Sequence, residues 1–169
     1  MIWGIYFASL ALPLQQYGLI PRTGIGLIGI FSSPLLHASW QHLLGNSISF
    51  TFFAIILALL EGEKMFIKIF LMVLIGGSLT WLMGRSANHI GASGLIFALW
   101  AYLLLAGWFS KSVKYILISL LLIFFYSGMI FGILPGKPGV SFEGHFFGAV
   151  AGIIVAWIYH KKSKKKGEY

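Results

Sequence analysis

Apolar residues along this chain are gathered in long runs that short polar or glycine-rich connections separate. Five of the runs are close to the ~20 residues that an α-helix needs to cross the hydrocarbon of a bilayer. These predicted spans are 42–61, 64–83, 93–110, 113–132 and 144–160. The pattern therefore predicts an all-α polytopic membrane protein that forms a single domain over residues 1–169.

A sixth apolar run, at 1–19, is interrupted by Pro13, Gln15 and Gln16. We interpret it as a first span, because no basic segment precedes it as one does in a cleaved signal peptide. It is short for a span, which leaves open a truncated first helix. The connection 20–41 is rich in Gly, Pro and Ser and still apolar. We expect it to be an irregular loop at the membrane interface.

Composition places the chain in lipid and argues against nucleic acid as a partner. Only 9% of the 169 residues are charged and 59% are hydrophobic, whereas soluble domains carry about a quarter charged residues. The net charge of +8 does not come from a basic patch interleaved with aromatic residues. Five of the twelve basic residues lie in the tail 161–169, directly after the last span. Such a tail is typical of a cytoplasmic anchor on anionic lipid.

The distribution of Lys and Arg predicts the orientation. With a cytoplasmic N-terminus, the inner side holds Lys64, Lys68, Lys111, Lys114 and the five tail lysines, and the outer side holds Arg22, Arg85 and Lys137. This bias of nine to three predicts six spans in a cell membrane, with both termini in the cytoplasm.

Polar side chains within apolar spans are costly and are candidates for function. Counting from the inner edge at 1.5 Å per residue, Ser93 lies roughly 27 Å away and His145 roughly 24 Å. Asn46 lies roughly 22 Å and His42 roughly 28 Å from that edge by the same rise. In a core ~30 Å thick, all four lie at a similar depth, a few ångströms below the outer surface. We therefore expect them to form one site that opens to the outer side.

Ser93 begins an apolar helix in the string Gly91-Ala92-Ser93-Gly94. Free backbone N–H groups and the positive end of the helix dipole surround a residue in that position and favour an oxyanion. Glycines on both sides let a substrate backbone come close. The alternative interpretation is that Ser93 only caps the helix, a position in which serine is common.

His145 shares one helical face with Gly148 and Gly152, at i, i+3 and i+7. Small residues three or four apart let another helix pack at close range, and Gly94 and Ala98 offer a matching face. Close packing of these helices would bring the imidazole within hydrogen-bond reach of the Ser93 hydroxyl, as nucleophile and base require. The alternative is ordinary helix packing beside an incidental histidine.

His42 and Asn46 are four residues apart and therefore lie on the same face of their helix. Their N–H groups can serve as donors to an oxyanion beside Ser93, or they can form a polar contact between helices. The remaining histidines have less direct interpretations. His37 stabilises the interfacial loop, His89 is a rim candidate in a loop, and His160 is interfacial.

The acidic residues limit the chemistry further. They are Glu61, Glu63, Glu143 and Glu168, and the chain has no Asp and no Cys. An aspartyl dyad, a Ser-His-Asp triad and thiol catalysis are therefore excluded, and no H-E-x-x-H string is present to bind zinc. We expect no metal and no cofactor. A hydrolase built from this sequence would use a Ser-His dyad.

Three segments resemble, in order and spacing, the motifs of rhomboid intramembrane proteases. They are 37–46 (HASWQHLLGN), 91–94 (GASG) and 145–152 (HFFGAVAG), and the resemblance extends over roughly residues 20–160. It implies a six-helix bundle and a Ser93–His145 dyad, with His42, Asn46 and the Ser93 amide stabilising the oxyanion. It also implies transmembrane proteins as substrates, cut within or just outside their membrane segment.

The chain departs from this family at two places. Many relatives carry a tyrosine that stacks on the catalytic histidine where this chain has Phe97, which keeps a ring but no hydroxyl. The Trp-Arg pair of the first external loop is absent. Two other functions stay open: a catalytically silent rhomboid-like protein that escorts membrane clients, and a small transporter or channel. Silent rhomboid-like proteins usually lack the serine or the histidine, whereas this chain has both. Transporters often have internal symmetry and paired acids, which the predicted spans lack.

Overall fold

The computed structural model describes residues 1–136 and 139–166, and these are helices and connecting loops without a strand. The helices are α1 (Ile2–Ser9), η1 (Leu14–Tyr17), α2 (Gly24–Ser32), η2 (Ser33–Leu35), α3 (Trp40–Glu61), α4 (Lys64–Met83), α5 (Ser93–Ser110), α6 (Val113–Tyr126), η3 (Ser127–Ile133) and α7 (Phe142–Lys166). Five segments are long and apolar enough to cross a membrane: α3, α4, α5, α6 with η3, and α7. The chain is thus a multi-pass membrane protein with an all-α bundle.

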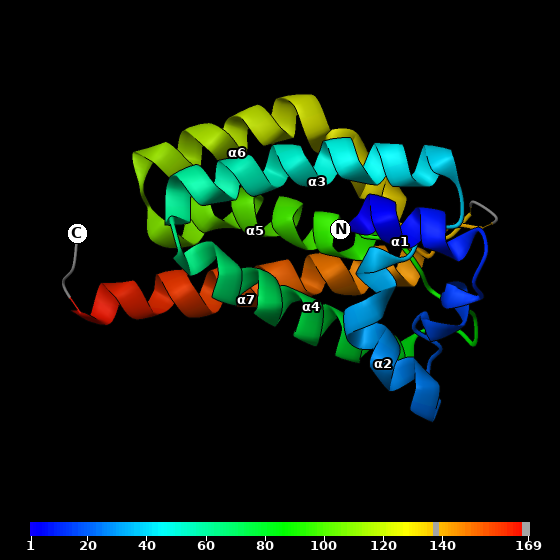
Figure 1. The fold of residues 1–169 in the computed structure, drawn as a ribbon. Coiled ribbons are helices and arrows are strands. Elements are labelled where there is room, and N and C mark those ends of the chain that lie inside the picture. The colour runs from blue at the N-terminus through cyan, green and yellow to red at the C-terminus, as the bar shows by residue number, and fades with distance from the viewer. Residues whose placement is uncertain (137–138, 167–169) are drawn as a thin grey trace.

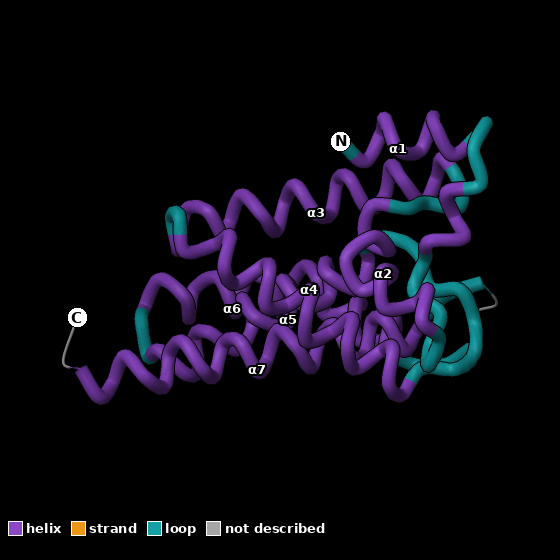
Figure 2. Tube along the Cα trace, turned by 60° about the horizontal axis from the view of Figure 1, so that its bottom comes forward, coloured by secondary structure: helices purple, strands orange, loops and turns teal. Residues whose placement is uncertain are grey.

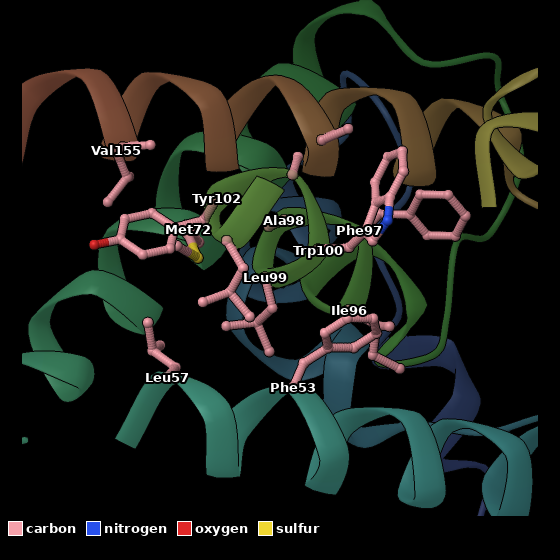
Figure 3. Close-up of a cluster of buried hydrophobic side chains, with 14 of the residues drawn as sticks. Phe53, Leu57, Met72, Ile96, Phe97, Ala98, Leu99, Trp100, Tyr102 and Val155 are labelled. Carbon is pink, nitrogen blue, oxygen red and sulfur yellow. The ribbon is translucent and has the colours of Figure 1, made fainter. Parts of the chain in front are cut away.

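Helix α5 lies in the middle of the bundle, between α3 and α6 on one side and α4 and α7 on the other (Figure 1). All of its residues from Ile96 to Leu103 are buried. They contact Phe53 and Leu57 of α3 on one face and Val155 of α7 on the opposite face (Figure 3). Because lipid tails are as apolar as these side chains, close packing rather than the hydrophobic effect holds such helices together. The central helix therefore fixes the positions of the others.

The first predicted span, 1–19, differs in the structure. It contains α1, η1 and a bend between them instead of one continuous helix. The eight residues of α1 rise about 12 Å, which is too short to cross ~30 Å of hydrocarbon. Pro13 precedes η1 and lacks the N–H that would continue the helix. Instead α1 packs on the start of α3, where Trp3 Nε1 donates to Ser47 Oγ at 3.2 Å.

The connection 20–41 is more regular than the sequence indicated, because it contains α2 and η2. Thr23 caps α2 by accepting a hydrogen bond from Gly26 N at 3.1 Å. The glycines that suggested an irregular loop are packing positions. A methyl group on Gly26 would lie 1.9 Å from Ile20 O, and one on Gly29 would lie 2.3 Å from Leu19 Cα. Only glycine therefore allows α2 to lie against the backbone of Leu19 and Ile20.

The two ends of the bundle differ in character. The longer connections gather at the end where α1 and α2 lie, and the C-terminal end of α7 lies at the opposite end (Figure 2). Helix α7 continues to Lys166 and so includes most of the predicted tail 161–169, of which 167–169 lie outside the described residues. Lys137, which was counted on the outer side, also lies outside them.

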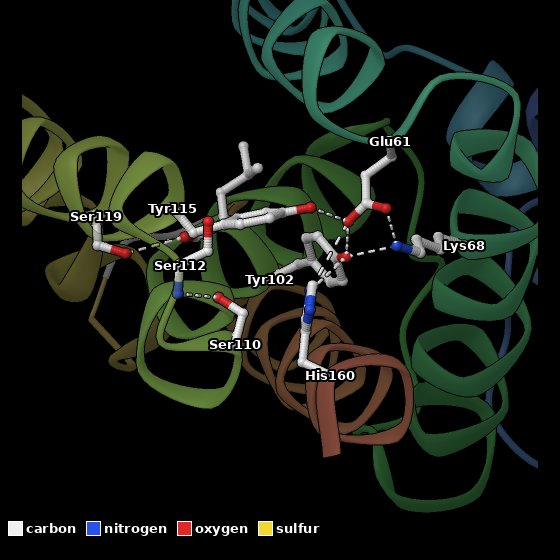
Figure 4. Close-up of polar contacts among 9 residues, drawn as sticks. Glu61, Lys68, Tyr102, Ser110, Ser112, Tyr115, Ser119 and His160 are labelled. Carbon is white, nitrogen blue, oxygen red and sulfur yellow. Dashed lines mark hydrogen bonds and ion pairs between the residues drawn. The ribbon is translucent and has the colours of Figure 1, made fainter. Parts of the chain in front are cut away.

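A buried charged cluster joins all five spanning segments at the end opposite the long connections (Figure 4). Its members are Glu61 of α3, Lys68 of α4, Tyr102 of α5, Tyr115 of α6 and His160 of α7. Lys68 and Glu61 form an ion pair, with side chains only 2% and 8% exposed. Both tyrosine hydroxyls donate to Glu61 Oε1. Tyr102 in turn accepts from Lys68 Nζ at 2.7 Å.

This cluster gives two residues partners that the sequence did not indicate. Lys68 was counted on the inner side, and it lies one turn inside α4, where Glu61 pairs with it. His160 was predicted to be interfacial, and its Nε2 lies 3.0 Å from Tyr102 OH.

Candidate active site

The turn before α5 sets the position of Ser93. Gly91 has a φ of +115°, a conformation that side chains disfavour. A methyl group there would also lie 2.5 Å from His42 Nε2. Helix α5 then begins at Ser93 with Ala92 as its N-cap residue, and no side chain caps the helix. The structure therefore does not support the alternative in which Ser93 serves as a cap.

The Ser93 hydroxyl lies against the imidazole of His145. Ser93 Oγ and His145 Nε2 are 2.8 Å apart, and these residues come from α5 and α7. The other ring nitrogen, Nδ1, lies 2.9 Å from the carbonyl oxygen of Gly132 in η3. Since a carbonyl only accepts, Nδ1 carries the proton of the neutral ring. Nε2 is then free to accept a hydrogen bond from Ser93.

Phe97 covers one face of this imidazole. The two rings are stacked, with centroids 4.2 Å apart and an angle of 9° between their planes. Phe97 thus forms the ring stack with His145 that was expected at this position. Together with the Gly132 carbonyl, this stacking fixes the orientation of His145.

Small residues allow α5 and α7 to approach closely enough for the contact between Ser93 and His145. A methyl group on Gly148 would lie 2.0 Å from Gly94 O, and one on Gly152 would lie 2.0 Å from Ala98 O. No larger side chain fits at either glycine without separating the helices. The face predicted from Gly148 and Gly152 is therefore in contact with the face predicted from Gly94 and Ala98.

His42 and Asn46 line the same cleft as Ser93, from the adjacent helix α3. Asn46 is 7% exposed, and its Nδ2 has no hydrogen-bond partner within the described part of the chain. An amide donor that is buried and unpaired costs free energy unless something accepts from it. His42 contacts the ring of His37, with centroids 5.1 Å apart. Burial, and then the neighbouring His42, lower the pKa of His37.

The cleft has a volume of about 510 Å³ and is lined by both Ser93 and His145. A second cavity of about 370 Å³ shares Ser93, His42 and Asn46 with it. This second cavity continues between α3 and α6 as far as Tyr126. A chain of several residues can therefore reach Ser93 both from the loop end and from the side of the bundle.

The rim of the cleft contains residues that the sequence did not single out. Arg85 Nη2 donates to Val140 O at 2.9 Å, and Arg85 Nε lies 3.4 Å from Glu143 Oε1. His89 was a rim candidate, and it does line the cleft. Its Nδ1 lies 2.6 Å from Ser141 Oγ, and its Nε2 lies 3.1 Å from Arg85 O. His89 thus ties the segment before α5 to the segment before α7.

No group of three or more His, Asp or Glu side chains in the described residues is arranged to hold a metal ion. The chemistry available at the cleft is that of a hydroxyl, an imidazole that accepts its proton, and amide donors nearby. This combination suits acyl transfer to a serine.

Comparison with known proteins gives consistent matches. A family model described as the Rhomboid domain matches residues 26–162. An uncharacterized protein of Mycobacterium tuberculosis is 36% identical over 161 residues, which cover 90% of this chain and 67% of that protein. One of Mycobacterium leprae is 36% identical over 95% of this chain and 69% of its own length. RHOMBOID-like protein 1 of Arabidopsis thaliana is 31% identical over 77% of this chain and 34% of its own length.

Proposed function

This chain belongs to the rhomboid family, and from that premise we propose that it is an intramembrane serine endopeptidase. It hydrolyses peptide bonds in or next to the transmembrane segments of membrane-anchored proteins. The observation that carries this proposal is the 2.8 Å distance between Ser93 Oγ and His145 Nε2 inside an open cleft. It supports the pairing of a nucleophile with its base, which a catalytically silent relative would not need.

In the proposed mechanism, Ser93 Oγ attacks the carbonyl carbon of the substrate while its proton moves to His145 Nε2. In the imidazolium that forms, Nδ1–H continues to donate its hydrogen bond to the Gly132 carbonyl. This carbonyl orients the ring, as a carboxylate does in a triad. Collapse of the tetrahedral intermediate breaks the C–N bond, and Nε2 returns the proton to the departing amine. A water molecule then repeats the sequence on the acyl-enzyme and releases Ser93.

The negative charge of the tetrahedral intermediate needs donors that are in place before the reaction. We assign this role to the Ser93 amide at the start of α5, to the amide group of Asn46 and to the ring of His42. The unpaired Nδ2 of Asn46 supports the assignment, because an oxyanion would supply the missing acceptor.

We further propose that the protein lies in a cell membrane with the cleft facing the outer side and the C-terminal end of α7 in the cytoplasm. Because α1 is too short to cross, five spanning segments would leave the N-terminal residues on the outer side, and not in the cytoplasm as six spans predicted. Lys64, Lys111 and Lys114 are exposed at the end opposite the cleft, as the positive-inside rule requires. A substrate helix must unwind before its backbone can reach Ser93, because its peptide bonds are otherwise shielded by the helix.

The test uses the full chain in detergent micelles with a fluorophosphonate probe and a reporter protein that has one transmembrane segment. Wild-type protein should be labelled and should cut the reporter. Ser93→Ala should lose both activities, and His145→Ala should lose cleavage while its circular dichroism stays that of the wild type. Ser112→Ala, at the opposite end of the bundle, is the matched control and should behave like the wild type.

Cleavage that persists in Ser93→Ala would show that this serine is not the nucleophile. Failure of the wild type to react with the probe and with a panel of such reporters would instead favour the silent, client-escorting class.

A further inference from the structure

A groove of about 750 Å³ runs between α5 and α6 at the end of the bundle opposite Ser93. Its floor includes Gly107 and Ser119, where the two helices are in contact. A methyl group on Gly107 of α5 would lie 2.7 Å from Ser119 Oγ and 2.9 Å from Tyr115 O. Ser119 Oγ donates to Leu104 O at 2.7 Å, so the hydroxyl in the floor already has a partner. The floor therefore favours an apolar occupant.

The side chains that form the walls of the groove are apolar and exposed. Trp108 is 81% exposed, Leu120 is 58% exposed and Ile123 is 53% exposed. Both helices belong to spanning segments, so hydrocarbon rather than water surrounds Leu120 and Ile123. Their apolar character alone fits any acyl chain and does not select one lipid from another.

One lysine in the groove, and a second that follows it by three residues, supply that selection. Lys111 lines the groove, and Lys114 is exposed in the first turn of α6. Among the described residues, no carboxylate pairs with either lysine. Glu61, at the same end of the bundle, is already committed to Lys68. Both ammonium groups are therefore available to an anionic headgroup.

The backbone at Lys111 adds a separate argument. Lys111 ends α5 in the left-handed conformation, with a φ of +58°, where glycine is the usual residue. Helix termination alone would be served better by glycine. A cation here also complements the carbonyl end of α5, but that effect does not account for Lys114. Trp108 precedes Lys111 by one turn, as interfacial tryptophans precede cytoplasmic lysines in membrane proteins.

We propose that this groove is a binding site for one anionic phospholipid. An acyl chain lies between α5 and α6, and the phosphate lies against Lys111 and Lys114. In the proposed orientation this is the cytoplasmic leaflet, where anionic lipids are concentrated. The site is separate from the cleft at Ser93 and does not depend on proteolytic activity.

The first experiment is native mass spectrometry of the full chain, released from bilayers that contain equal amounts of phosphatidylglycerol and phosphatidylcholine. Wild-type protein should retain phosphatidylglycerol preferentially. Lys111→Gln should lower that preference about 5-fold, and Lys111→Gln/Lys114→Gln about 25-fold, from the usual contribution of a lysine at an anionic surface. Lys64→Gln removes an exposed lysine at the same end but outside the groove, and it should leave the preference unchanged.

A double variant that still prefers phosphatidylglycerol would overturn the proposal. An equal loss in Lys64→Gln would do so too, because net charge and not the groove would then explain the binding. Displacement of the lipid by an excess of inorganic phosphate would identify a free-anion site instead of a lipid site.

The second experiment locates the acyl chain with a phosphatidylglycerol that carries a photoreactive diazirine in its tail. Labelled peptides should come from residues 104–123, and Leu120→Trp, which fills the groove from an exposed position, should lower that labelling. Uniform labelling of all spans, or crosslinks between two copies through the groove, would contradict a lipid site.

Discussion

The ion pair between Glu61 and Lys68 makes a quantitative prediction about stability. Replacing Glu61 by glutamine is expected to lower the free energy of unfolding by about 3–5 kcal/mol, the usual cost of leaving one buried ion without its partner. The glutamine oxygen can still accept from Tyr102 and Tyr115, so those two hydroxyls keep an acceptor. The loss falls on Lys68, which is 2% exposed. Its ammonium then keeps the Tyr102 hydroxyl, at 2.7 Å, and its place over the ring of Tyr159, 4.7 Å from the centroid, but no carboxylate.

A second substitution separates the charge from the packing. Lys68→Met in the Glu61→Gln background removes the stranded cation and keeps most of the buried volume. Replacement of both members of a buried ion pair is often close to neutral. The double variant should therefore be more stable than Glu61→Gln alone, and the two substitutions should couple by about 2–3 kcal/mol.

The free energy of unfolding can be measured by titrating each variant in mixed micelles with sodium dodecyl sulfate and following helicity by circular dichroism. Glu63→Gln is the control, because Glu63 lies in the same turn with its side chain exposed, and it should match the wild type. If Glu61→Gln also matches the wild type, or if the double variant shows the plain sum of the two single losses, the ion pair does not stabilise the bundle as argued.

Three further substitutions test the cleft and its supports. Asn46→Ala should lower turnover of the reporter by about 10- to 1,000-fold if Asn46 donates to the oxyanion, while Ser47→Ala, on the next residue, should not. Gly148→Ala should destabilise the bundle by about 1–3 kcal/mol, because the facing carbonyl lies 2.0 Å from the new methyl group. Gly4→Ala, which meets nothing within 4 Å, should not lower the melting temperature. Phe97→Leu should lower turnover by about 2- to 10-fold through loss of ring stacking, and an unchanged rate would show that the stack is dispensable.

The geometry around Ser93 could be predicted because it depends on regular helices. A constant rise per residue gives the depth of each polar side chain, and helical periodicity gives the face on which Gly148 and Gly152 lie. Both quantities follow from counting. The 2.8 Å contact between Ser93 and His145 then needs only that small residues face one another. The catalytic roles of these residues remain predictions until the variants are measured.

Other features of the structure could not be predicted from the spacing of residues along the chain. The partner of His145 Nδ1 is the backbone carbonyl of Gly132. Every residue carries such a carbonyl, so the sequence does not single out this one. The glycines of α2 suggested a loop, because glycine has a low helix propensity. Their role in close packing depends on which segment they contact, and the sequence does not give that. Lys68 did carry a signal, since it lies within an apolar run. Its partner Glu61 could not be identified, because that residue comes from the preceding span and the pairing depends on how the two helices pack.

Buried polar groups are paired in the cluster at one end of the bundle, whereas one buried donor at the other end is unpaired. This difference supports the location of the proposed active site. At one end, each side chain of the cluster around Glu61 has a partner, so the cluster can hold five segments together but has no capacity left for a ligand. At the other end, Asn46 Nδ2 is buried and unpaired beside a cleft that Ser93 and His145 line. An unpaired donor weakens the folded protein by itself. It is tolerable where a substrate oxygen that becomes negative in the transition state can supply the acceptor, and stability is then recovered at the moment when catalysis needs it.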